Sequence, residues 1–149
     1  MERPRLAVAG GLTLGFGLGG LADGIVLHHV LQWHNLVSDV VARDSLAGLE
    51  RNVFWDGVFH LATLALLLAG AVLLWRADAG RVPAARVAGL VLVGWGAFHA
   101  VDQLLFHLAL GLHDMRQDAA NAWAYNWGFF AVGLAVAAGG ALLLRRSRT

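Results

Sequence analysis

Long apolar runs separated by short polar segments dominate this chain. Charge-free runs occupy residues 6–22, 61–75, 87–101 and 127–144. A helix that crosses the hydrocarbon core of a bilayer needs about 20 predominantly apolar residues. With their flanking residues, these runs predict four transmembrane helices at about residues 6–31, 53–75, 84–111 and 122–144. Only short connections remain, so residues 1–149 are predicted to form one integral membrane domain, an all-α four-helix bundle in contact with the lipid bilayer.

Composition agrees with this interpretation and excludes several kinds of chemistry. The chain is 58% hydrophobic, and its 14% of charged residues is well below the roughly 25% of soluble domains. It has no cysteine, which excludes disulfides, iron–sulfur clusters and thiolate zinc sites. The net charge of +1 gives no basis for a nucleic-acid partner. Because serine is confined to one loop and the C-terminal end, no serine nucleophile is expected, and no catalytic residue is assigned.

The positions of the arginines predict an orientation in the membrane. Eight of the eleven basic residues fall before the first predicted span, between the second and third, or after the fourth. Basic residues near the ends of the spans favour the cytoplasmic side, so both termini are predicted to be cytoplasmic. Counted at 1.5 Å per residue from that side, all seven histidines fall in the outer half of the membrane or at its outer surface.

Two segments repeat one spacing of polar residues, D-x4-H-x5-H. They are Asp23, His28 and His34, followed by Asp102, His107 and His113. The helices that follow also align, residues 55–60 with residues 125–130. The pattern predicts two repeated helical hairpins, with equivalent residues at equal depth around an axis along the membrane normal.

Histidine and aspartate within apolar helices are the candidate metal ligands. A polar side chain at this depth costs several kcal/mol unless it is paired, neutral or bound to something. The predicted metal-binding residues are Asp23, His28, Asp56, His60, His99, Asp102 and His107, with His34 and His113 ranked below them.

Helical spacing groups some of these residues and separates others. In an α-helix, Asp56 and His60 share a face, and His99 with Asp102 share another. Asp23 and His28, five residues apart, would point about 140° apart on an α-helix, which is poor geometry for one ion. Asp56, His60, His99 and Asp102 are therefore expected to lie together, with Asp23 and His28 approaching from the first predicted helix and His107 from the outer end of the third.

The donor atoms favour zinc or copper, with iron as a further candidate, because imidazole and carboxylate suit these metals. Other interpretations stay open. One is a haem-b electron carrier with axial histidines from two helices. Others are a proton path, a set of structural His–Asp hydrogen bonds, or a structural or assembly subunit of a larger membrane complex. Metal-dependent redox or hydrolytic chemistry is compatible with the first interpretation.

Three glycines on the first predicted helix, Gly11, Gly15 and Gly19, recur every four residues. Small residues at this spacing let two helices approach closely in lipid. The stripe could pack inside the chain or, as a homo-oligomer contact, against a second copy. Packing inside the chain is the favoured alternative.

The sequences A-D-G-I-V-L-H at residues 22–28 and L-Q-W-H at residues 31–34 resemble a motif of small four-span bacterial membrane proteins that carry a domain-of-unknown-function label. Asp56 to His60 and His107 to His113 match the same family at their places. The resemblance implies a four-helix fold in the bacterial inner membrane and a His/Asp site, and it brings no established activity. The chain departs from the family pattern at Asn35, Phe106, Leu108 and Asp114, three of which replace histidines, so the bound metal could differ.

Overall fold

Four long helices form the molecule in a computed structural model that describes residues 2–147. Helix α1 (Arg3–Asp23) runs into a π-helix, η1 (Gly24–Val30), and α3 (Ala84–Val101) runs likewise into the π-helix η3 (Asp102–Ala109). The other two long helices are α2 (Leu46–Arg76) and α4 (Ala122–Arg146), and the short 3-10 helix η2 (Ala79–Arg81) lies between α2 and α3. No strand occurs within residues 2–147.

Each long helix could cross a bilayer, which confirms the predicted all-α membrane fold. The candidate spans are Arg3–Val30, Leu46–Arg76, Ala84–Ala109 and Ala122–Arg146. The second begins earlier than the apolar pattern predicts. Ser45 caps this helix, its side-chain hydroxyl accepting a hydrogen bond from the Gly48 N–H, so the helix starts in polar sequence before the apolar part.

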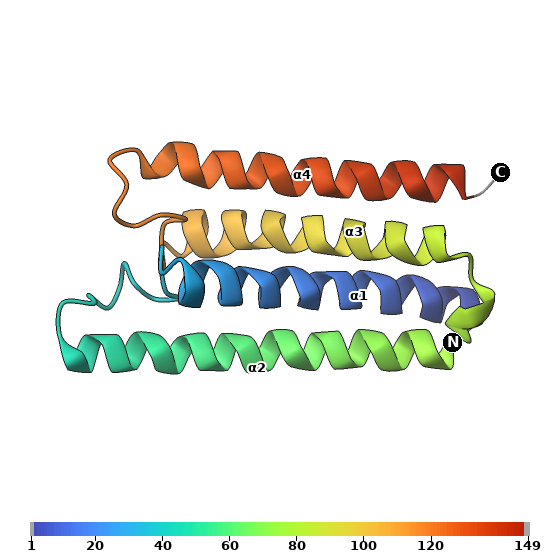
Figure 1. The fold of residues 1–149 in the computed structure, drawn as a ribbon, viewed down its shortest axis with the longest axis horizontal. Coiled ribbons are helices and arrows are strands. Elements are labelled where there is room, and N and C mark those ends of the chain that lie inside the picture. The colour runs from blue at the N-terminus through green and yellow to red at the C-terminus, as the bar shows by residue number, and fades with distance from the viewer. Residues whose placement is uncertain (1, 148–149) are drawn as a thin grey trace.

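The helices lie side by side in the order α2, α1, α3, α4 (Figure 1). The two central helices, α1 and α3, pack on each other, and each is flanked by the helix that follows it in the chain. The start of α1, the end of α4 and the link between α2 and α3 are at one end of the row (Figure 1). The two longer connections meet at the opposite end, which we call the loop end (residues 31–45 and 110–121).

Glycines set the close approach of α1 and α3. A Cβ atom on Gly15 would overlap the backbone carbonyl of Val91, and one on Gly94 would overlap the carbonyl of Leu12. The two contacts are reciprocal, because each residue of α3 stands 79 positions after its counterpart in α1 (15 to 94, 12 to 91). The stripe through Gly15 therefore packs inside the chain, the favoured alternative, and is covered by α3.

Both central helices change to π-helix at an aspartate near the loop end. In η1 the Leu31 N–H donates to the Val26 carbonyl at 2.8 Å, and in η3 the Leu110 N–H donates to the Leu105 carbonyl at 2.9 Å. These i to i−5 bonds are characteristic of π-helix, which is rare and is found often at functional sites. The α-helical prediction for these turns was wrong, and the π-helices change which side chains meet.

Candidate metal centre

Four buried histidines pack together at the loop end, two from each half of the chain. They are His28, His34, His107 and His113. The rings of His34 and His113 stack at 4.5 Å between centroids, and the His107 ring lies 4.4 Å from that of His113. His28 completes the cluster, with its ring 4.5 Å from that of His34. We call these four residues the histidine cluster.

Two crossed hydrogen bonds hold the central pair of rings. The His34 Nδ1–H donates to the Met115 carbonyl at 2.7 Å, and the His113 Nδ1–H donates to the Leu36 carbonyl at 3.0 Å. Each loop thus supplies one histidine and one carbonyl, and both partners are shifted by the same 79 positions. The loops are joined further by two backbone bonds, from the Asp39 N–H to the Leu112 carbonyl and from the Gln117 N–H to the Trp33 carbonyl.

These bonds determine the tautomer of both rings. Because a carbonyl only accepts, Nδ1 carries the proton and Nε2 keeps its lone pair. His34 and His113 are 0% and 1% exposed, and neither Nε2 has a hydrogen-bond partner. Burial holds the pKa of each imidazole well below its ordinary value, and the neighbouring histidines lower it further. Both residues are therefore neutral near pH 7, the form in which imidazole binds metals.

The other two rings each bond the aspartate five residues earlier or lie against it. His107 Nε2–H donates to Asp102 Oδ2 at 3.0 Å, which leaves His107 Nδ1 buried without a partner. His28 Nε2 lies 3.3 Å from Asp23 Oδ2. The expectation that residues five apart diverge was wrong here, because the π-helix places i and i+5 on nearly the same side.

Asp56 organises the cluster from the side of α2. One carboxylate oxygen accepts from His28 Nδ1–H at 2.9 Å and from the Leu36 N–H at 2.8 Å. The other accepts from the Asn35 side-chain amide at 2.6 Å. With three donors directed at it, this buried carboxylate orients His28 and the loop, the role that partners of metal-binding histidines usually have.

Within residues 2–147, two groups of side chains could hold a metal ion. In each, three ligand atoms lie within 4.8 Å of one another. One group is His28, His34 and His113, and the other is Asp102, His107 and His113. His113 belongs to both, so it is the centre of the cluster. Both groups include residues of η1 or η3 and of the loops, which brings together segments that are far apart in sequence.

Four of the predicted site residues lie outside both groups: Asp23, Asp56, His60 and His99. Asp23 and Asp56 lie against His28, whereas His60 and His99 have other partners. His60 Nδ1–H donates to the Asp56 carbonyl one turn earlier, at 2.6 Å, and its ring stacks on that of His29. His99 accepts from Trp95 Nε1–H at 2.9 Å. Their role as metal ligands stays a prediction, and His34 and His113, which the sequence ranked lowest, lie at the centre of the cluster.

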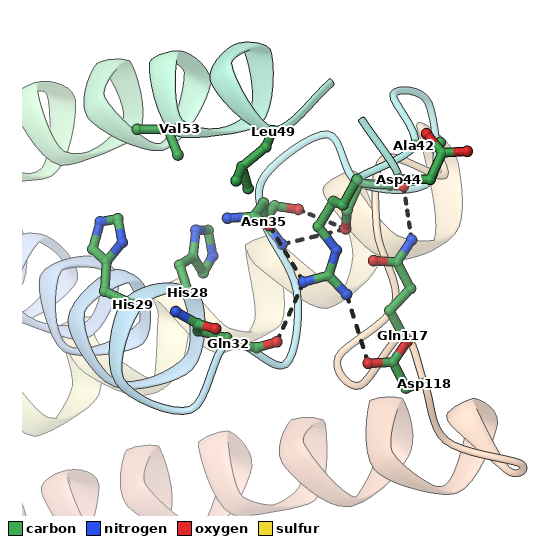
Figure 2. A pocket seen from close by; sticks show the side chains of 12 residues that line it. His28, His29, Gln32, Asn35, Ala42, Asp44, Leu49, Val53, Gln117 and Asp118 are labelled. Atoms are coloured by element: carbon green, nitrogen blue, oxygen red, sulfur yellow. Dashed lines mark hydrogen bonds and ion pairs between the residues drawn. The ribbon is translucent and has the colours of Figure 1, made fainter. Parts of the chain in front are cut away.

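A cavity of about 660 Å³ opens beside the cluster at the loop end (Figure 2). Its walls include His28, the exposed His29 and Gln32. Arg43 crosses it, donating to the Gln32 carbonyl at 3.3 Å and lying 3.8 Å from the Asp118 carboxylate. The cavity gives solvent a path toward the His28 edge of the cluster.

Sequence reasoning missed the two loop carbonyls and Asn35. The carbonyls of Leu36 and Met115 belong to the backbone, so no residue type marks them. Asn35 could have been found, because it stands beside His34 at the place of a family histidine, and it reaches Asp56.

Fold and cluster together define a four-span membrane protein with buried histidines and aspartates at one end. The chain belongs to a family described as predicted membrane proteins, DUF2243, whose model matches residues 10–147. This match confirms the family resemblance drawn from the D-G and L-Q-W-H motifs. No curated protein and no solved structure matches the chain.

Proposed function

We propose that this protein is a membrane metal-binding protein that holds one Zn²⁺ or Cu²⁺ ion in the histidine cluster. His28, His34 and His113, one of the two candidate groups, supply three nitrogen ligands, and Asp56 orients the His28 ring. The observation that carries the proposal is the crossed pair of hydrogen bonds, which leaves two buried Nε2 lone pairs with no donor. Burying such groups is costly unless something binds them.

The donor set favours Zn²⁺ or Cu²⁺ over other common metals. Neutral imidazoles suit zinc, copper, iron and nickel, whereas Mg²⁺ and Ca²⁺ prefer oxygen ligands. Cu(I) prefers sulfur, and Met115, which lies beside the cluster, contributes its backbone carbonyl to His34. The cavity beside His28 supports access for an ion or a small ligand from the aqueous side, which the arginine pattern predicts to be non-cytoplasmic.

Ring packing does not favour haem b at this place. A haem with two histidine ligands needs a porphyrin plane between the two imidazoles. His34 and His113 stack at 4.5 Å with their planes inclined by 12°, and His107 packs against them at 4.4 Å. Rings in direct contact leave no space for a porphyrin between them.

The alternative function is a purely structural network of His–Asp hydrogen bonds that stabilises the fold. Such a network would pair both nitrogens of its buried rings. Here His34, His107 and His113 each bond through one nitrogen and leave the other buried without a partner. Histidines that bind a metal typically have one nitrogen hydrogen-bonded and the other free for the metal. This pattern is unusual for a network that only stabilises the fold.

Metal content of purified protein tests the proposal. The full chain, grown with added zinc or copper and purified in detergent, is expected to retain about one ion per chain. His34→Ala and His113→Ala should each lower metal occupancy at least tenfold, since removal of even a supporting residue typically costs 10–100-fold. Elemental analysis measures the content, and circular dichroism checks that the helices persist.

His29→Ala is the matched control, because His29 is exposed and lies outside both candidate groups. It should keep the metal content of the parent protein. The same measurement on His60→Ala and His99→Ala decides whether these two residues also bind metal. Full metal content in the double variant of His34 and His113, with the fold intact, would refute the centre.

A further inference from the structure

A second, smaller cavity opens on the membrane-facing side of the helix row. It measures about 300 Å³ and is formed by α1, η1, α3 and α4. Trp95, Phe129 and Val136 line it, with Val26 and Val132 45% and 54% exposed beside it. Because these valines belong to spans that lipid surrounds, the cavity is accessible from the bilayer. It does not share its lining with the larger cavity of the loop end.

Two polar residues interrupt this apolar lining, and both have an unused atom. His99 is 6% exposed, and since its Nε2 accepts from Trp95, its Nδ1 carries a proton with no acceptor. Asp23 is 4% exposed, and its Oδ1 has no donor. Unpaired polar atoms of this kind are rare in folded proteins and call for a partner.

We infer that this cavity binds a lipid-soluble phenol, such as a hydroquinone with an apolar tail. A hydroxyl group matches the chemistry of these two residues, because a hydroxyl can accept from an N–H such as His99 Nδ1–H and donate to a carboxylate oxygen such as Asp23 Oδ1. Trp95 and Phe129 both line the cavity, and their rings favour contacts with an aromatic ligand. A volume of about 300 Å³ is at the small end of ligand sites and accommodates one substituted ring.

Asp23 connects the phenol site to the histidine cluster. Its Oδ1 is free for the ligand, while Oδ2 lies 3.3 Å from His28 Nε2. A bound hydroxyl would therefore be separated from the cluster by one carboxylate. None of the four histidines of the cluster lines this cavity, so the inference stands independently of whether the cluster holds a metal.

Photolabelling of the full chain in phosphatidylcholine nanodiscs tests the site. The probe is 4-decylphenol with a diazirine in its tail, and mass spectrometry locates the label. Label is expected on the α4 segment that carries Val132 and Val136. Unlabelled 4-decylphenol should compete at least tenfold more strongly than decylbenzene. Decylbenzene lacks the hydroxyl and therefore cannot form the two buried hydrogen bonds.

His99→Leu should reduce labelling about tenfold, whereas His29→Leu, a histidine outside the cavity, should label like the parent. Equal competition by decylbenzene would show that the cavity holds only lipid and would overturn the inference. So would unchanged labelling of a folded His99→Leu variant. Should that variant fail to fold, the competition in the parent protein decides alone. Metal-free and metal-loaded protein should label equally, so loss of metal binding would leave this result intact.

Discussion

The first hairpin, α1 with η1 and α2, and the second, α3 with η3 and α4, use the same contacts but place their charge differently. In the first, the Asp56 carboxylate on α2 accepts from the Leu36 N–H and from Asn35. In the second, the Asn126 amide on α4 accepts from the Met115 N–H and donates to Asp114. Each hairpin thus pairs one loop residue with one helix residue, and aspartate and asparagine have exchanged positions.

This exchange changes the surroundings of the histidines. In the first hairpin the helix carboxylate also binds His28, which consequently lies between Asp23 and Asp56. In the second, Asn126 is occupied by the loop, and His107 bonds Asp102 alone. The two hairpins share the backbone arrangement. Because the helix position holds Asp56 in the first and Asn126 in the second, the His28 side of the cluster is the more anionic. Two hairpins with matched contacts are what an internal repeat produces, and we keep the repeat as an interpretation of these pairs.

Alanine substitution of Asp56 and of Asn126, the helix residue of each pair, should give the largest difference in stability between the two hairpins. Asp56→Ala deprives three donors of their acceptor, the His28 ring, the Asn35 amide and the Leu36 N–H. We expect a loss of about 3 kcal/mol or more, because each buried unpaired group costs about 1–3 kcal/mol. Asn126→Ala should cost less, about 1–2 kcal/mol. Thermal unfolding in detergent measures both.

Asp118→Ala is the control, since this side chain is exposed and its contact with Arg43 is a surface ion pair. Equal losses in Asp56→Ala and Asn126→Ala would contradict the proposed difference between the hairpins. The double substitution Asn35→Asp with Asp56→Asn sharpens the test by giving the first hairpin the arrangement of the second. Its loss should be smaller than the sum of the single losses by about 1 kcal/mol, the coupling typical of contacting residues.

Glycine substitutions test the feature that the hairpins share. Gly15→Ala and Gly94→Ala each place a methyl group against the backbone carbonyl of the facing helix. Backbone cannot move aside as a side chain can, so we expect each to destabilise the protein by about 1–3 kcal/mol, and by similar amounts. Gly139→Ala should be neutral or slightly stabilising, because nothing lies within 4 Å of the added carbon. A large difference between Gly15→Ala and Gly94→Ala, measured by thermal unfolding, would show that the interface is not reciprocal.

Much of the fold could be predicted from the sequence, because lipid imposes a simple length rule. The four apolar runs predict spans that end close to the observed helix ends. The start of α2 differs by several residues, because Ser45 caps a helix whose first turns carry Glu50 and Arg51 outside the apolar run. Hydropathy is insensitive to such polar helical extensions.

The candidate site was predictable only in part. The D-x4-H-x5-H spacing contains all four histidines of the cluster. However, α-helical geometry separated Asp23 from His28, and their place at or beyond the outer helix ends ranked His34 and His113 low. The first error arises from a local change of helix type and the second from contacts between the two loops. The π-helix brings residues five apart together, and the loops cross so that each histidine reaches the carbonyl of the other loop. Neither effect has a signal in side-chain pattern, because both depend on backbone bonds.

The smallest expected effect is a pH dependence that the two hairpins should share equally. His34 and His113 have a folded-state pKa lowered by burial, while in the unfolded chain their pKa is about 6.5. As the pH falls below about 6.5, the unfolded chain takes up protons that the folded protein excludes, so stability decreases with acidification. In metal-free protein, unfolding at pH 7.5 and pH 5.5 should differ by about 1 kcal/mol for each of the two residues. His34→Gln and His113→Gln should each remove about 1 kcal/mol of that dependence, and His29→Gln, an exposed histidine, should leave it unchanged. A pH dependence that persists in the double variant of His34 and His113 would assign the acid sensitivity to other groups. A pH dependence lost on substitution of only one of these histidines would mean that the hairpins differ in their histidines as well as in their carboxylates.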